Sequence, residues 1–539
     1  MRNSQNLAFL ATKTAIKNHK FFVLFVAIYC AILVAFSRYA PNLDDSWMWL
    51  RIIEGKMDEI YMGFRPQIGR FWTLGLVELP ILAKISTSPY LFFAFNALLF
   101  ALFSALYLKI LNISNGKSAL NAFITALLSL STAFVIVFFG ICYGEKIQVI
   151  WLSIFMLCSF FAINGTGGGR LAKSTQSHQI IGIIALNIAL HYKEPTFIAA
   201  FAFGVVVLIF ALQNRRKDLA KYALCVIFSA CYFALLYYYL VFGEIDKTYS
   251  ALVAKSTLAV LWEYAINDSI VVFGVGGMVL FRAYRIIFKR EKIEPYFDGL
   301  LCASFGYFSA FVVLKMSAPY YLLPCYAFGI PSLLYFGRKY FCNIFIKIVL
   351  FLGLFGFFAQ NLPSGIHKMI DLKAQGVQFH RALDFVAQYL REHKSADIYF
   401  EGIGRGRELY DFEMEMRPLW FAEYLERVHK ASNFDLQTSA PNGADFRPNA
   451  KAKYTLLNSE MLSAPKSGDL IIVSNKSAFG DALARASTKG EVVYKSGFPS
   501  IPNIALAQFL RYAWDLRQGA ESRANYFVLS LQTYVIQAK

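Results

Sequence analysis

Long apolar runs alternate with short polar segments from residue 21 to residue 358. An α-helix rises about 1.5 Å per residue, so about 20 apolar residues cross the hydrocarbon layer of a bilayer. The runs therefore predict a polytopic α-helical membrane protein with about eleven transmembrane helices. The predicted spans are 21–36, 90–108, 119–139, 147–163, 180–190, 196–212, 222–242, 270–287, 300–314, 321–336 and 344–358.

The pattern changes after Asn361. A basic amphipathic helix is predicted at 367–394, and short β-branched and aromatic runs then alternate with helical stretches such as 479–486. This alternation is typical of a small α/β domain. We therefore expect a transmembrane domain at 1–360 and a C-terminal α/β domain at 361–539, with strands at 398–400, 470–473 and 492–494.

The stretch between the first two spans, residues 37–89, is the longest polar loop of the membrane part. It holds the tryptophans Trp47, Trp49 and Trp72 among cations, which favours helices lying in the membrane interface. The amphipathic segment 71–85 could instead be a true span. That alternative would invert the orientation of everything after it.

Composition supports the membrane assignment. Only 16% of the residues are charged, against about 25% in soluble domains. The net charge of +18 lies largely in short loops and not along a reading helix, which argues against nucleic-acid binding. All eight cysteines lie in or beside apolar runs and none forms a Cys-x-x-Cys pair, so no disulfide framework or zinc site is indicated.

Loop charges predict the orientation. With a cytoplasmic N-terminus and a retained first helix, the predicted cytoplasmic loops hold most cations and the outer loops mainly single lysines, as the positive-inside rule requires. An odd number of spans then places the C-terminal domain in the periplasm of a bacterial inner membrane. The cytoplasmic cations are Lys13, Lys17, Lys20, Lys109, Lys117, Arg170, Lys173, Arg215, Arg216, Lys217, Lys221, Lys289, Arg290, Lys292, Arg338 and Lys339.

Four polar groups fall on the predicted outer side. They are the acidic pair Asp44-Asp45, the segment from Tyr143 to Lys146, the segment from His191 to Pro195, and the segment from Ser317 to Pro324. Ionisable groups at this depth are costly and indicate a functional site.

Each group also has a structural explanation. Asp45 could cap a helix starting at Ser46. Glu145 and Lys146 could form an interfacial ion pair, and Lys193-Glu194 could be a turn between two helices. Tyr320-Tyr321 could belong to the aromatic belt at the membrane surface.

The order of these motifs resembles the integral-membrane glycosyltransferases of the GT-C fold. Members carry acidic residues after the first helix, as Asp44-Asp45 here, and an acidic position after the third, as Glu145 here. A lysine follows between two short helices, in Lys193-Glu194-Pro195, and an aromatic-Tyr-Leu-Leu-Pro run comes late, at Tyr320 to Pro324. The late motif has Tyr320 where arginine is usual, and the C-terminal domain lacks a Trp-Trp-Asp motif.

The resemblance implies transfer of a hexose or pentose from a polyprenyl-phosphate or -diphosphate carrier to a glycan, lipid or protein acceptor, with inversion at the anomeric carbon. A polymerase or ligase for surface polysaccharide is the nearest enzymatic alternative. A transporter or flippase is the alternative from another class. Transporters favour charges at the bilayer midplane, whereas here the polar groups cluster at the predicted outer ends.

The resemblance also implies roles for the residues. Such a transfer needs a carboxylate that accepts the hydroxyl proton, and Asp44 is the predicted base, with Asp45 positioning the acceptor or capping. Lys193 is predicted to bind the carrier phosphate, helped by Arg65, Arg70 or His191.

Three further residues complete the predicted site. Glu145 could orient the acceptor or ligate a divalent metal ion together with Asp44, and metal use stays open. Tyr320 and Tyr321 could hydrogen-bond the phosphate or stack on the sugar.

Overall fold

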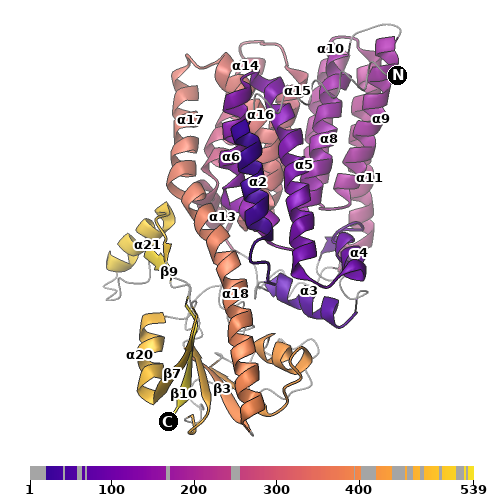
Figure 1. Cartoon of the computed structure of the whole chain (residues 1–539). Helices are drawn as coiled ribbons and strands as arrows, with labels where there is room; N and C mark the ends of the chain where they lie inside the picture. Colours follow the sequence, from indigo (N-terminus) through magenta and orange to yellow (C-terminus); the bar gives the residue numbers. More distant parts are fainter. Residues whose placement is uncertain are drawn as a thin grey trace. The chain divides into compact units, whose positions relative to one another are not determined.

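The computed structural model is mostly helical, with a small sheet near the C-terminus (Figure 1). This confirms the predicted fold class, a helical membrane protein with a C-terminal α/β domain. The described residues are 20–39, 43–56, 63–66, 69–165, 170–244, 255–393, 395–401, 420–439, 456–457, 465–473, 479–496, 501–517, 527–529 and 532–539.

The chain divides into two compact units. The membrane unit comprises Met1–Ala35, Asp58–Ser86 and Leu91–Ile366. The C-terminal unit comprises Phe36–Met57, Thr87–Tyr90 and His367–Lys539. The first half of the long loop thus groups with the C-terminal part of the chain.

The helices of the membrane unit follow the apolar runs of the sequence. Every predicted span falls on a helix or on two helices in succession. The α-helices are α2 (Lys20–Val34), α4 (Glu78–Ile85), α5 (Pro89–Asn115), α6 (Ser118–Ser129), α7 (Thr132–Phe139), α8 (Glu145–Asn164), α9 (Arg170–Leu190), α10 (Thr196–Gln213), α11 (Lys217–Leu240), α13 (Thr257–Asn267), α14 (Gly276–Ile287), α15 (Pro295–Val313), α16 (Leu323–Lys339) and α17 (Ile344–Gly356). The 3₁₀- and π-helices are η3 (Phe242–Glu244), η4 (Ile270–Val275), η5 (Pro319–Leu322) and η6 (Phe357–Asn361).

Seven helical segments in the described part of the chain are long and apolar enough to cross a bilayer, and the bent pair α6–α7 makes eight if it counts as one span. The helix α2 is apolar but has only 15 residues, and α16 has 17. The count of eleven spans therefore stays a prediction.

The segment 71–85 does not form a spanning helix. Its first residue ends a two-stranded hairpin, β1 (Phe64–Arg65) with β2 (Arg70–Phe71), and α4 covers only eight residues. Eight residues rise about 12 Å, less than half the thickness of the hydrocarbon layer. The alternative in which this segment crosses the membrane is wrong, because Trp72 to Val77 leave the helix too short.

The predicted third span is broken. Helices α6 and α7 meet at an angle of 67°. Asn361 repairs the break, because its side-chain oxygen accepts from the backbone N–H of Thr132 at 2.8 Å, one of the N–H groups that the start of α7 leaves without a helical partner. Gly365 permits the close approach, since a Cβ there would lie 1.9 Å from the carbonyl oxygen of Leu130.

The C-terminal unit is built on a mixed six-stranded sheet of order β5-β4-β3-β6-β10-β7. Strand β3 pairs in parallel with β4 and β6, whereas β10 is antiparallel to β6 and β7. The elements of the unit are α3 (Leu43–Ile53), α18 (Leu362–Glu392, shared with the membrane unit), β3 (Ala396–Glu401), β4 (Phe434–Ser439), β5 (Leu456–Leu457), β6 (Leu470–Val473), α20 (Phe479–Lys489), β7 (Gly490–Lys495), β8 (Ile501–Pro502), α21 (Leu506–Arg517), β9 (Val528–Leu529) and β10 (Tyr534–Ala538).

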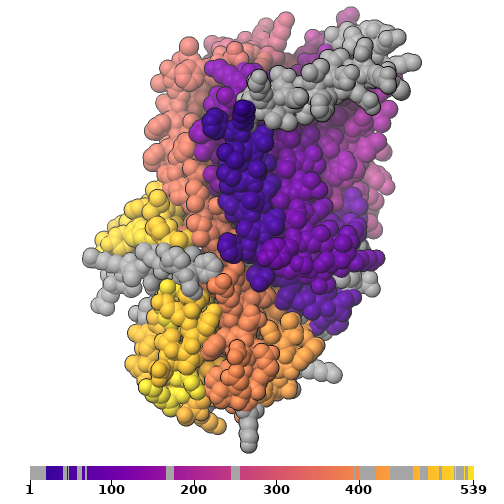
Figure 2. Space-filling model, in the orientation of Figure 1, coloured from indigo at the N-terminus to yellow at the C-terminus, as the bar shows by residue number. Residues whose placement is uncertain are grey.

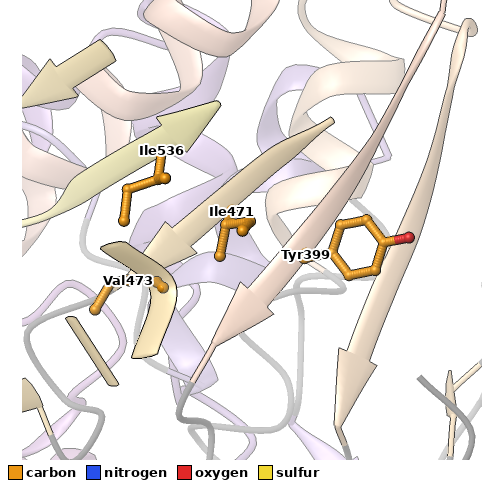
Figure 3. Close-up of a cluster of buried hydrophobic side chains, with 5 residues drawn as sticks. Tyr399, Ile471, Val473 and Ile536 are labelled. Atoms are coloured by element: carbon orange, nitrogen blue, oxygen red, sulfur yellow. The ribbon is translucent and has the colours of Figure 1, made fainter. Parts of the chain in front are cut away.

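One face of this sheet is covered by α20. Figure 3 shows side chains of three adjacent strands, β3, β6 and β10, forming the buried cluster beneath it. Ile471 and Ile536 are fully buried there, and Ala486 of α20 packs against them. The predicted strands at 398–400 and 470–473 thus contribute to this core, together with β10, which the sequence analysis did not predict.

A buried arginine joins α14 to α15 in the membrane unit. Arg282 donates two hydrogen bonds to Asp298, at 2.8 and 2.7 Å, and a third to the Tyr340 hydroxyl at 2.8 Å. Only 2% of the Arg282 side chain is exposed. A charge buried this deeply depends on its partner, because the interior cannot replace the lost hydration.

Replacing Arg282 should destabilise the membrane unit strongly. We expect Arg282→Met to lower the free energy of unfolding by about 3–5 kcal/mol, because Asp298 would stay buried without its partner. Thermal unfolding of the purified chain in detergent measures the effect. Arg285→Met is the matched control, since Arg285 binds Glu291 with a side chain that is 36% exposed, and it should change stability far less. Equal losses in the two variants would contradict this account.

Candidate functional site

The centre of the candidate site is an ion pair between two turns of the membrane unit. Lys193 lies in the short turn between α9 and α10, and Glu145 is the first residue of α8. The Lys193 Nζ lies 2.7 Å from a carboxylate oxygen of Glu145, and the two side chains are only 6% and 3% exposed. Lys146 points elsewhere and donates to the carbonyl oxygens of Gly140 and Ile141. The ion-pair partner of Glu145 is therefore Lys193, which lies 48 residues later in the chain.

Aromatic rings surround the lysine. The Lys193 Nζ lies 4.5 Å from the centre of the Trp72 ring, 5.0 Å from that of Tyr321 and 5.9 Å from that of Tyr320. Ring faces attract cations at such distances and keep water away from them. We call Trp72, Tyr320, Tyr321 and the ion pair the lysine cage. Two of the predicted site tyrosines thus join Lys193 and Glu145.

Glu194 fixes the first-loop hairpin to the turn that carries Lys193. Its carboxylate accepts from the backbone N–H of Phe71 at 2.8 Å and from the indole N–H of Trp72 at 2.5 Å. These bonds span more than 120 residues of sequence. Glu194 therefore sets the position of the Trp72 ring over the lysine.

The remaining predicted cations lie around this anchor. Arg70 lies over the Trp72 ring, with its guanidinium carbon 4.6 Å from the ring centre. Arg65 is the register partner of Arg70 across the hairpin and is half-buried. His191 contacts the Thr73 hydroxyl at 2.6 Å through Nδ1. Burial lowers the pKa of His191, so the ring is neutral at pH 7 and acts there as a hydrogen-bonding group.

Sequence reasoning did not single out three residues of this region. Trp72 was assigned only to the membrane interface, and Glu194 only to a turn. Glu78 of α4 is also buried, and burial raises its pKa while the Lys146 ammonium opposes that change. The signal available in the sequence was weak, since Trp72 and Glu78 lie in the long polar loop 37–89 and Glu194 in the short turn that also holds Lys193.

The acidic pair lies in the C-terminal unit, whereas the lysine cage lies in the membrane unit. The helix α3 begins at Leu43, so Asp45 stands within its first turn and does not cap a helix starting at Ser46. Carboxylates in the first turn interact favourably with the positive end of the helix. Asp45 is 1% exposed; the Asp44 side chain lies outside the described residues.

Helix α3 is held by aromatic and ionic contacts to the C-terminal residues. Trp49 stacks on Tyr424 with ring centres 4.0 Å apart and meets His380 edge-on at 5.1 Å. Glu54 forms an ion pair with Arg427. Burial raises the pKa of Tyr424, and the Tyr39 and Asp45 side chains add to the effect, which locates the Asp45 carboxylate near this ring.

No group of three potential metal ligands among His, Cys, Asp and Glu occurs within the residues that the structure describes. The Asp44 side chain, one of the two ligands expected from the sequence, is not among them. Glu145 already faces an ammonium group at 2.7 Å. The cation that the Glu145 carboxylate binds in this structure is therefore the Lys193 ammonium.

No protein-family model and no curated protein matches the chain. Among solved structures it is similar to apo ArnT from Cupriavidus metallidurans, with 12% identity over 89% of this chain and 96% of that chain and a TM-score of 0.40. ArnT from the same organism bound to undecaprenyl phosphate gives 10% identity, coverage of 96% and 98%, and a TM-score of 0.43. The apo oligosaccharyltransferase of Archaeoglobus fulgidus gives 13% identity over 75% of this chain and a TM-score of 0.41, and the chain spans 64% of its length.

These structures belong to the GT-C class of glycosyltransferases, the class that the order of the sequence motifs resembles. At identities of 10–13% and TM-scores of 0.40–0.43, these likenesses assign no role to any residue of this chain.

The Trp72–Glu194 hydrogen bond should contribute measurably to stability. Glu194→Gln can place its amide nitrogen against the indole N–H, and a buried donor left without an acceptor costs about 1–3 kcal/mol. Trp72→Phe removes the donor and keeps an aromatic ring. In thermal unfolding of the two single variants and the double variant, we expect the loss from Glu194→Gln to shrink by about half or more when Trp72 is already Phe. Additive losses would show that the two side chains are not coupled.

Proposed function

We propose that the protein is a membrane glycosyltransferase that moves a sugar from a polyprenyl-phosphate or -diphosphate carrier to a glycan, lipid or protein acceptor on the outer face of the membrane. The observation that carries the proposal is the lysine cage. A buried ammonium at the end of two membrane helices, walled by aromatic rings, suits an anionic headgroup whose tail stays in the bilayer. The ordered resemblance to GT-C enzymes supports the same assignment.

Lys193 is the proposed phosphate-binding residue. Lys193 forms an ion pair with Glu145 at 2.7 Å. An ammonium has three N–H donors, which can donate to phosphate oxygens. Because the rings of Trp72 and Tyr321 exclude water, the attraction between the ammonium and the phosphate is stronger than in bulk solvent. Arg70, stacked on Trp72, is the nearest additional cation for a second phosphate charge.

The reaction is a displacement at the anomeric carbon of the sugar. The acceptor hydroxyl oxygen forms a bond to that carbon while the bond from the carbon to the carrier phosphate oxygen breaks. The electron pair goes to the phosphate, whose growing charge Lys193 stabilises. The hydroxyl proton goes to a carboxylate, for which the Asp44-Asp45 pair is proposed. Adjacent carboxylates repel one another, which favours proton uptake by one of the two.

Binding of the carrier phosphate provides the first test. Undecaprenyl phosphate is titrated against the purified chain in lipid nanodiscs, with undecaprenol, which lacks the phosphate, as the reference ligand. We expect Lys193→Met to weaken binding of undecaprenyl phosphate by about 10- to 100-fold, since a hydrogen bond to a charged group contributes about 1.5–3 kcal/mol. Binding of undecaprenol should not change.

Two controls separate charge from folding. Lys84→Met removes an exposed lysine of α4 and should leave binding unchanged. Because Lys193→Met leaves Glu145 buried alone, the double variant Lys193→Met with Glu145→Gln restores neutrality and should fold while still binding weakly. Equal affinity of the wild type and of this double variant for undecaprenyl phosphate would overturn the proposed role of Lys193.

The acidic pair is tested by transfer. Membranes containing the chain are incubated with a radiolabelled polyprenyl-phosphate sugar, and label leaving the lipid fraction is measured. We expect one of Asp44→Asn and Asp45→Asn to reduce transfer by about 100-fold or more, the range of general-base catalysis, with unchanged binding of undecaprenyl phosphate. Full activity in both variants would exclude the pair as the base.

A further inference from the structure

The C-terminal unit has one concentrated apolar surface outside its core. Among its described residues beyond 393, the exposed large apolar side chains are Val428, Val492, Ile504, Phe509, Leu510, Trp514 and Leu516. Five of these seven lie between Ile504 and Leu516, on or just before α21. Trp514 is 62% exposed. Isolated exposed apolar residues are ordinary, but a local group of this kind indicates a binding surface.

The exposed group forms one side of the helix. At 100° per residue, Phe509, Leu510, Trp514 and Leu516 fall within about half of the circumference. Tyr512 and the edge residue Phe509 pack on Phe527 of the same unit, with ring centres 5.3 and 4.8 Å apart, while Phe509 stays 49% exposed. Figure 2 shows α21, in yellow, at the surface of the C-terminal unit. The helix thus has one side attached to its own unit and an apolar side exposed.

The chemistry of this side fits a bilayer surface. Arg511 and Arg517 are exposed on the same helix as Trp514, and this combination of tryptophan, aliphatic residues and arginine is typical of helices lying at the headgroup level. Arginine adds attraction to anionic lipid headgroups. A second copy of the chain is a poorer fit, since 12 residues of helix offer on the order of a few hundred Å², and stable dimers bury about 1,200 Å² or more in total.

The C-terminal unit is also joined covalently to an apolar helix long enough to cross the bilayer. One continuous helical run, Ile344–Glu392, contains a membrane-spanning stretch and continues into the C-terminal unit as α18. A surface joined in this way to a membrane segment meets lipid at high local concentration, so even a weak interfacial affinity leads to binding.

We propose that α21 is an interfacial helix that docks the C-terminal unit onto the headgroup layer of the bilayer containing the membrane unit, through Phe509, Leu510, Trp514 and Leu516. The docking does not depend on the proposed transferase activity. It assigns the C-terminal unit a lipid-binding surface.

Photocrosslinking tests the docking in the full chain. Phe509→p-benzoylphenylalanine keeps a large aromatic side chain and reacts on illumination with the nearest C–H bonds. The protein is reconstituted into vesicles of phosphatidylethanolamine and phosphatidylglycerol, illuminated and analysed by mass spectrometry. The matched control places the same residue at Ala484, an exposed position of α20 in the same unit. We expect phospholipid adducts to be at least about tenfold more abundant at position 509 than at 484.

Three outcomes decide the proposal. Abundant lipid adducts at position 509 alone support it. Adducts joining two chains would overturn it in favour of a dimer interface, and equal lipid yields at 509 and 484 would overturn it as well. Adding Trp514→Ser to the crosslinking variant should lower the lipid yield several-fold while thermal unfolding stays unchanged, because the side chain is exposed. Crosslinking needs no catalysis, so its failure is distinct from a failure of the transferase assays.

Discussion

The end of the membrane unit that holds the lysine cage depends on the buried pairing of Lys193 with Glu145. Neither charge is stable in an apolar surrounding without the other, since the loss of hydration costs several kcal/mol for each ion. The pair therefore ties the turn between α9 and α10 to the start of α8. The next residue in the turn, Glu194, binds the first-loop hairpin, and the hairpin in turn carries Trp72 back to the lysine. Four segments are thus held together by two adjacent residues of one turn.

A different set of contacts holds the acidic pair. Trp49 lies about one turn after Asp45 on α3, and its ring stacks on Tyr424 and meets His380 edge-on. The ion pair of Glu54 with Arg427 fixes the other end of the same helix. These contacts within the C-terminal unit set the position of Asp45.

The sequence predicted the parts of the structure that depend on local pattern. Apolar runs identified the membrane helices, and the short runs predicted as strands at 470–473 and 492–494 lie in strands β6 and β7. The grouping of Lys193, Glu145 and the tyrosines was also expected, although only as neighbours on one face. The break between α6 and α7 and the hairpin β1–β2 were not predicted. Both depend on single contacts between distant residues, Thr132 with Asn361 and Trp72 with Glu194, which leave no periodic signal in either segment.

The continuous helix from Ile344 to Glu392 connects the two units, but a single helix does not by itself fix the orientation of the unit attached to it. Such a helix permits rotation of the attached unit about the helix axis and bending at π-helical turns such as η6. A second attachment in the headgroup layer would remove that freedom. Because α3 belongs to the same unit as α21, docking of α21 would also limit the orientations open to Asp45.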